Sequence, residues 1–206
     1  GAGTVFAGCF TNEPDDDGYR AWNTLLSGGY RWDSGAELAG NFLRTTSFVD
    51  YDGSYQNQSR HAQQVAGVRL SFDPMAAWKV TLNAGQSLDK ATDYHDGAYV
   101  GYGDSRRNQA SWQNDISLAA NQLLTLGVDY QQEHIASSTG YLDSTRDNTG
   151  GFALYQGTFG ANELQLSARR DHNQQFGNHS TGAIALSHNF AGGLQLTASY
   201  GSDSPR

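Results

Sequence analysis

Apolar and polar residues alternate along most of this chain. From Trp22 to Trp32 the even positions are mostly apolar and the odd positions mostly polar. A period of two places successive side chains on opposite faces of a β-strand, so the stretch predicts a strand with one dry face and one wet face. Similar stretches recur at 36–42, 67–72, 78–84, 110–118, 124–130, 163–168, 184–190 and 194–200, with fainter strands at Thr4–Gly8 and Gly151–Thr158. The pattern predicts an all-β protein of about eleven strands.

The connections between these strands alternate in length. Short turns are predicted at 33–35, 73–76, 119–122, 159–162 and 191–193, and long polar loops at 10–17, 50–60, 86–105, 132–147 and 171–180. An antiparallel up-and-down sheet with its turns at one end and its loops at the other is typical of an outer-membrane β-barrel. Ten residues at about 3.3 Å each, tilted by about 45°, rise roughly 23 Å, which is close to the apolar band of such barrels. We therefore predict a segment of a transmembrane β-barrel.

A soluble β-sandwich is the main structural alternative, because its strands alternate in the same way. Two features favour the barrel. The dry face is nearly free of charge in most strands, and aromatic residues gather near strand ends, where interface girdles lie in membrane barrels. These aromatic residues are Trp22, Tyr30, Trp32, Phe72, Trp78, Tyr130, Phe190 and Tyr200.

Composition excludes several classes of protein. The 206 residues carry a net charge of −8, and the 13 Lys and Arg residues are scattered, so nucleic acid is not an expected partner. The single cysteine, Cys9, cannot form an intramolecular disulfide. No apolar run approaches the roughly 18 residues of a membrane helix. The first residues, GAGTVFAGCF, lack the basic region and cleavage pattern of a signal peptide.

No enzyme signature is found, since the chain has no nucleophile elbow, HExxH sequence or phosphate-binding glycine loop. The most polar stretch is RRDHNQQFGNHSTG, and His172, His179 and Asp171 within it could be taken for a metal or acid–base cluster. The two histidines are seven residues apart across a predicted loop, a spacing that fixes no geometry. We interpret the stretch as an external rim with solvated histidines.

Several stretches, in this order, carry a resemblance to a known family: SRRNQASWQNDISL, LTLGVDYQQE, RDNTGGFALYQ, ARRDHNQQFGNHST and LQLTASYGSDSPR. They resemble strands of the BtuB-like vitamin B12 (cobalamin) receptors, a family of TonB-dependent transporters of the Gram-negative outer membrane. The similarity extends back through DDDGYRAWNTLLSGGY. It implies a 22-stranded barrel plugged by an N-terminal domain. Residues 1–206 are then expected to be an internal piece of the barrel domain, without the plug and the C-terminal strands, because about eleven strands cannot close that circumference.

Two acidic stretches, PDDDGY at 14–19 and VDYDG at 49–53, are predicted to lie in neighbouring loops. Clustered carboxylates suit calcium, which takes six to eight oxygen ligands, although a solvated acidic loop is the equally simple alternative. The resemblance implies calcium, because BtuB-like receptors order their substrate loops with it, and Asp15, Asp17, Tyr51 and Asp52 fall where that motif has its ligands. The following strand begins QNQSRHAQQV and lacks the acid expected there.

The function implied by the resemblance is active uptake of cobalamin, with energy supplied by the TonB complex through the absent plug. The dry faces would contact outer-membrane lipid. By composition alone, tyrosines of the predicted loops are candidate ligand contacts, namely Tyr51, Tyr55, Tyr94, Tyr99 and Tyr102. Three alternatives stay open: a TonB-dependent siderophore receptor, a passive outer-membrane pore with porin activity, and a soluble carbohydrate-binding β-sheet protein.

Overall fold

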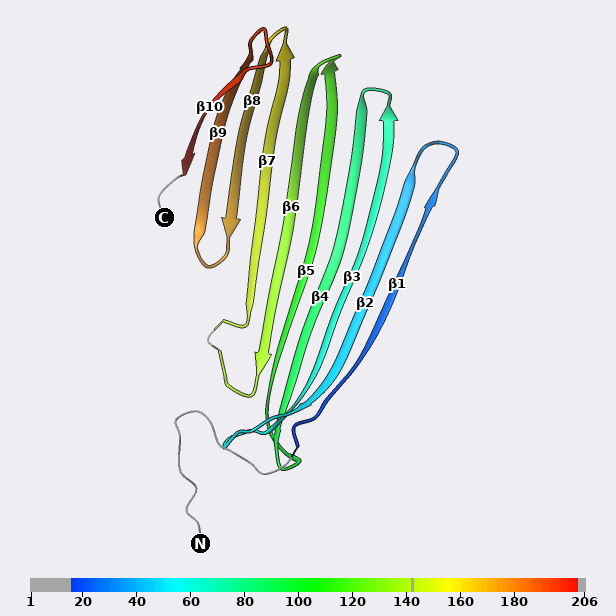
Figure 1. Cartoon of the computed structure of the whole chain (residues 1–206), viewed down its shortest axis with the longest axis vertical. Coiled ribbons are helices and arrows are strands. Elements are labelled where there is room, and N and C mark those ends of the chain that lie inside the picture. The colour runs from blue at the N-terminus through cyan, green and yellow to red at the C-terminus, as the bar shows by residue number, and fades with distance from the viewer. Residues whose placement is uncertain (1–15, 142, 204–206) are drawn as a thin grey trace.

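The described part of the chain forms one antiparallel sheet of ten strands in sequence order (Figure 1). The computed structural model describes residues 16–141 and 143–203. The strands are β1 (Tyr19–Arg31), β2 (Glu37–Asp50), β3 (Gln58–Met75), β4 (Trp78–His95), β5 (Ala98–Ala119), β6 (Gln122–Ser137), β7 (Thr145–Phe159), β8 (Asn162–Asn173), β9 (Gly177–Asn189) and β10 (Gln195–Asp203). The all-β, up-and-down prediction is confirmed, including the faint strand at 151–158. The strand expected at Thr4–Gly8 lies outside the described residues.

The sheet is a single layer. Directly paired residues of neighbouring strands share a face, so the register assigns each side chain to one of two surfaces. The even residues of β1 to β6 lie on one surface, which we call the apolar face, and the odd residues on the other, the polar face. Within the described ranges Val80 is the one hydrophobic residue that is buried, and no second sheet covers either surface. The soluble sandwich therefore has no counterpart here, because its core requires two packed sheets.

The apolar residues form a band that begins at the short turns. One row of paired residues crosses the sheet as Trp78, Ile116, Leu124, Tyr155, Leu166, Ile184 and Tyr200. One polar residue in the band is Asn114, whose Oδ1 accepts a hydrogen bond of 3.1 Å from Nε1 of Trp78. This bond satisfies an amide that would be costly to expose to hydrocarbon. Aromatic pairs mark the turn end of the band, with Tyr30 edge-on to Trp32 at 5.1 Å between ring centroids.

All five predicted short turns are present, and glycine carries the positive φ where one is needed. Gly35 has φ of 85° and Gly160 has φ of 61°, a conformation that residues with a Cβ rarely adopt. The register also shifts beside two of the turns, between Phe72 and Met75 and between Ser117 and Ala119. Such β-bulges adjust the twist where a strand ends.

The long loops are mostly shorter than the sequence predicted. The connection after β2 covers residues 51–57, the one after β6 covers 138–144, and the one after β8 covers 174–176. The predicted loop at 86–105 is wrong, because β4 continues to His95 and β5 begins at Ala98. Only Asp96 and Gly97 connect them, with φ of 50° and 77°, the positive values that a tight Asp-Gly hairpin turn requires. Between residues 86 and 105 polar residues stand on both faces of the two strands, so alternation could not reveal this part of them. Most of the loop expected at 10–17 lies outside the described residues.

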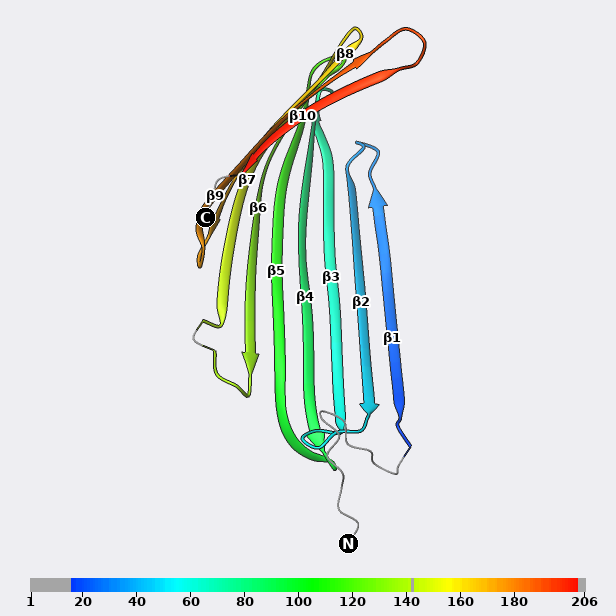
Figure 2. The same cartoon turned by 60° about the vertical axis from the view of Figure 1, so that its left-hand side comes forward.

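Strand length varies across the sheet, from 9 residues in β10 to 22 in β5. In Figure 2 strands β1 to β5 run nearly side by side, while β8 to β10 lean across the upper end, so the sheet is curved and twisted. Each described strand pairs only with its sequence neighbours, and β1 and β10 form the two edges. The chain is therefore an antiparallel, up-and-down β-barrel segment. No helix in residues 16–141 and 143–203 is long and apolar enough to cross a membrane.

The assignment of faces predicts the effect of a charge placed on each side of one strand. Leu166 lies on the apolar face in the middle of the band, and its neighbour Gln165 lies on the polar face. In the complete protein encoded by the reading frame around this chain, Leu166→Arg should destabilise the membrane-inserted barrel by about 2–4 kcal/mol. Gln165→Arg should cost less than about 1 kcal/mol, because its side chain stays in a polar environment. Urea unfolding in lipid vesicles measures both, and equal losses would show that the faces are assigned wrongly.

Candidate functional site

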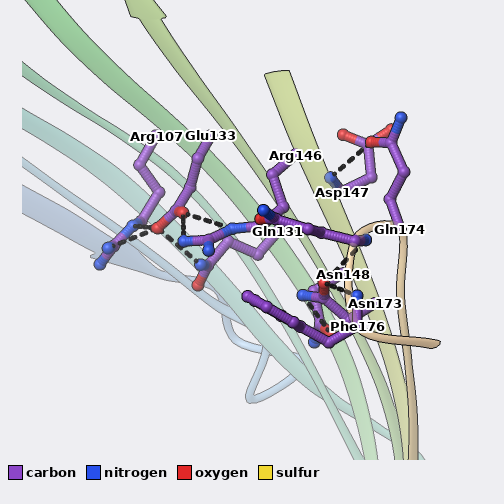
Figure 3. A network of polar contacts seen from close by, with 10 residues as sticks. Arg107, Gln131, Glu133, Arg146, Asp147, Asn148, Asn173, Gln174 and Phe176 are labelled. Carbon is purple, nitrogen blue, oxygen red and sulfur yellow. Dashed lines mark hydrogen bonds and ion pairs between the residues drawn. The ribbon is translucent and has the colours of Figure 1, made fainter. Parts of the chain in front are cut away.

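The polar face carries a network of charged side chains from three adjacent strands. Arg107 of β5, Glu133 of β6 and Arg146 of β7 are directly paired in the register and so meet on one surface. Arg107 donates to Oε1 of Glu133 from Nε at 2.9 Å and from Nη2 at 2.6 Å. Arg146 donates from Nε and Nη2 to the other oxygen, Oε2. Glu133 thus holds both guanidinium groups in fixed positions, as Figure 3 shows.

The network continues to the hairpin between β8 and β9. The guanidinium carbon of Arg146 lies 6.0 Å from the ring centroid of Phe176 in the connecting turn. Oδ1 of Asn173 accepts hydrogen bonds from the backbone N–H groups of Gln175 and Phe176, at 3.0 and 3.1 Å, which fixes the shape of this turn. Gln174 is joined to β7 through the backbone N–H of Asp147, which donates to Oε1 of Gln174 at 3.1 Å (Figure 3). The turn is therefore held against the wall of the sheet.

A second charged cluster lies nearer the band, around Arg169 of β8. Its Nη1 and Nη2 donate to the two carboxylate oxygens of Asp129 at 2.8 and 2.9 Å. Its Nε and Nη2 also donate to the two oxygens of Asp171 at 2.8 and 2.6 Å. One arginine is thus bidentate to two carboxylates, a geometry that the planar guanidinium fork allows and an ammonium does not.

Glycines on β6 and β7 make room for this cluster. Asp129 and Asp171 both pair with Gly150, so Arg169 has to reach across that residue to touch Asp129. A Cβ at Gly150 would lie 2.1 Å from Nη2 of Arg169, which leaves no space for a larger residue. In the same way the ring of Phe152 covers Gly127, and the guanidinium of Arg169 lies 6.0 Å from the centroid of that ring. The two glycines are therefore part of the cluster's geometry.

The first network borders a cavity of about 640 Å³ on the polar face. Its lining includes Gln63, Asp89, Ser105, Arg107 and Glu133, together with the apolar side chains Leu43, Val65 and Ile135. Nε2 of Gln63 donates to Asp89 at 3.3 Å. The cavity therefore offers fixed hydrogen-bond donors and acceptors of both charges beside apolar surface. Such a lining suits noncovalent binding of a large polar ligand or of another protein segment.

At the long-loop end, residues 51–57 are fastened to the hairpin between β4 and β5. The side chain of Asn57 donates to Asp96 at 2.8 Å and accepts from the backbone N–H of Asp96 at 2.9 Å. Ser59 donates to Asp93 at 2.7 Å, and the backbone N–H of Gly97 donates to Gln58 at 3.1 Å. These side-chain and backbone bonds fasten the end of the loop and the start of β3 to the hairpin.

The predicted calcium ligands are not assembled by the described residues. Asp15 lies outside them, and among those that are described no group of three His, Cys, Asp or Glu side chains is placed to hold a metal ion. Burial raises the pKa of the Tyr51 phenol and the charge of Asp93 raises it further, while a hydrogen bond with Gln56 opposes them. Asp17, Tyr51 and Asp52 alone do not fit a calcium site, and calcium stays a prediction for the full set.

The predicted ligand tyrosines are spread over the rim rather than gathered around the cavity. Tyr55 is 86% exposed at the tip of the loop after β2. Tyr94 and Tyr99 pack edge to face at 6.4 Å across the β4–β5 hairpin. Tyr102 is paired with Thr92 and lies with it on the apolar face, beyond the band. Three of these residues are thus on strands, because the loop predicted at 86–105 is a hairpin, and ligand contact by any of them stays a prediction.

The polar stretch at 169–181 forms the end of β8, a short turn and the start of β9, as the sequence predicted, and its two histidines do not form a cluster. Its place at an external rim stays a prediction. Nδ1 of His172 lies 3.1 Å from Oδ1 of Asn178 on one face of the hairpin. His179 pairs with Asp171 and so lies on the opposite face. The residues that sequence reasoning missed are Arg107, Glu133 and Arg146. They lie on the polar faces of three strands, and only the register shows that they are directly paired. Arg107 also follows the stretch that was wrongly predicted as a loop.

Comparison with known proteins adds to this geometry. No protein-family model matches the chain. The vitamin B12 transporter BtuB of Vibrio cholerae serotype O1 is 28% identical over 199 residues, covering 93% of this chain and 32% of the relative. The vitamin B12 transporter BtuB of Photobacterium profundum is 24% identical over 195 residues, covering 92% of this chain and 32% of the relative.

The chain resembles a segment of BtuB. It spans about a third of the length of these curated relatives. The relatives are named as transporters rather than as enzymes. This resemblance agrees with the fold, because the described residues form one sheet in a single layer.

The Arg169 cluster predicts that two adjacent glycines tolerate alanine differently. Gly150→Ala would displace the guanidinium and remove its paired hydrogen bonds, so the free energy of unfolding should fall by about 1–2 kcal/mol. The control is Gly151→Ala, because a Cβ there meets no atom within 4 Å. Both changes affect strand propensity alike, and urea unfolding of the complete protein measures the difference. Equal stability of the two variants would contradict the role given to Gly150.

Proposed function

We propose that this chain is part of the barrel wall of a TonB-dependent outer-membrane receptor that takes up cobalamin. The observation that carries the proposal is the single-layer sheet with an uncharged apolar band on one face and a fixed charged network on the other, in a chain similar to BtuB over 93% of its length. A wall of this kind separates lipid from a polar interior. Residues 1–206 then belong to a barrel domain of about 22 strands in a Gram-negative outer membrane.

The polar face has the chemistry for two roles in such a receptor. The cavity beside Arg107 and Glu133 presents amide, hydroxyl and charged groups that can hydrogen-bond a ligand descending from the rim. The same groups can bind a plug domain, through which the TonB complex would act. Cobalamin is large and carries many amide groups, so donors and acceptors of both charges suit it. A ferric siderophore receptor and a passive pore remain the alternatives that the experiment has to separate.

The first test is binding of labelled cyanocobalamin to outer membranes that contain the complete reading frame around this chain. Tight binding that excess ferric siderophore does not compete away is the expected result. Competition by siderophore would reassign the cargo, and an absence of binding together with ligand-independent permeability in liposomes would favour a pore.

A pair of variants tests the place of the cavity in ligand binding. Ser105→Trp puts an indole ring into the cavity lining and should weaken cobalamin binding by about tenfold, or about 1.4 kcal/mol. Ser117→Trp adds the same ring to the same strand and face near the turn end, away from the cavity, and should leave affinity unchanged. Equal cobalamin affinities of the two variants would show that the cavity does not take part in ligand binding.

We also propose that calcium orders the rim through Asp15, Asp17, Tyr51 and Asp52. Asp52→Asn should weaken calcium binding measured by isothermal titration, with a dissociation constant for the unaltered protein of about 10⁻⁴–10⁻³ M, the range of extracellular calcium modules. Asp33→Asn, at the opposite end of the sheet, is the control. Calcium titration that gives no heat in the unaltered protein would leave the acidic loops as solvated surface.

A further inference from the structure

The apolar face changes character beyond the band. On β1 to β6 the band has no charged side chain, but toward the long-loop end the same face carries Arg20, Arg44, Arg60, Lys90 and Arg106. The described carboxylates on this part of the face are Asp50, Asp104 and Asp147. A row of amides marks the border, where Gln86 donates to Asn108 at 2.8 Å and Asn108 donates to Gln132 at 3.4 Å. A net positive zone therefore follows directly on the band.

Part of this zone is hollowed into a groove of about 550 Å³. Arg20, Arg60 and Lys90 line it from three strands, and Trp22 and Phe48 supply its aromatic surface. The register explains the grouping, because Arg20 pairs with Phe48 and Phe48 pairs with Arg60. The groove thus combines two guanidinium groups with two large apolar rings at the edge of the band.

The two arginines are held in place without being neutralised. The guanidinium carbon of Arg20 lies 5.9 Å from the ring centroid of Trp22, and that of Arg60 lies 5.7 Å from Phe48 and 5.2 Å from Tyr94. Neither arginine forms an ion pair with a carboxylate in residues 16–141 and 143–203, whereas Lys90 pairs with Asp104 at 3.5 Å. Contact with a ring uses the face of the guanidinium and leaves its N–H donors free in the plane.

We propose that this groove binds the phosphate group of a membrane lipid headgroup. Two arginines line the same groove, and each guanidinium fork can bind phosphate oxygens bidentately. Trp22 and Phe48 suit the interfacial level, where aromatic rings contact the upper part of the lipid chains. A lipid is the occupant, rather than a free anion, because the groove opens on the face that continues as the apolar band. The inference rests on the proposed membrane position of the barrel.

The test uses the complete protein purified in detergent and radiolabelled short-chain phosphatidic acid in equilibrium dialysis. Replacing both arginines, Arg20→Gln with Arg60→Gln, should lower the affinity for phosphatidic acid by about tenfold or more. The matched control is Arg69→Gln with Lys79→Gln, which removes two positive charges from the polar face and should leave affinity unchanged. Diacylglycerol with the same chains, which lacks the phosphate, should bind weakly to every variant.

Each other outcome has a defined meaning. An equal loss in the control pair, or equal binding of diacylglycerol and phosphatidic acid, would overturn the proposal. Inorganic phosphate that competes as well as the lipid would reassign the groove to free anions and overturn the lipid occupant. Arg60→Lys keeps the charge but not the fork, so a partial loss is expected from it even if the double variant does not fold. Cobalamin binding is measured separately on the same preparations. A protein that binds phosphatidic acid but no cobalamin would contradict the proposed cargo and leave the lipid site standing.

Discussion

Backbone hydrogen bonding between sequence neighbours is the constraint on which the rest of this structure depends. Every described strand between the edges is paired on both sides, and the register is unbroken except beside turns and at the tip of the β4–β5 hairpin. The backbone is thereby satisfied within one layer, so the sheet needs no second layer to hide its polar groups. Side chains are then free to suit two different media, one on each face.

The polar face shows what such a layer can build without a hydrophobic core. Arg169 reaches Asp129 only because Gly150 has no side chain between them, and Phe152 fits only over Gly127. A glycine on one strand thus leaves the space that a large side chain of the neighbouring strand fills. The result is a surface whose donors and acceptors are positioned by hydrogen bonds to one another.

The character of the apolar face changes along the length of the strands and not from one strand to the next. Near the short turns it is uncharged, and farther along it carries Arg20, Arg60 and their neighbours. The same alternation therefore continues through two kinds of surface, an uncharged apolar one first and a charged one after it. This division also explains the error at 86–105, where strands that leave the band lose the pattern by which a strand is recognised.

The sequence alone determined the strands inside the band, the five short turns and the up-and-down order. A period of two and a turn glycine such as Gly35 are local signals that need no partner. The sequence also indicated the similarity to cobalamin receptors, from stretches such as ARRDHNQQFGNHST. Only the tertiary structure decided which polar residues meet, because Arg107, Glu133 and Arg146 are joined by register across three strands. Register depends on where each hairpin turns, and in strands that are polar on both faces no burial pattern fixes that point.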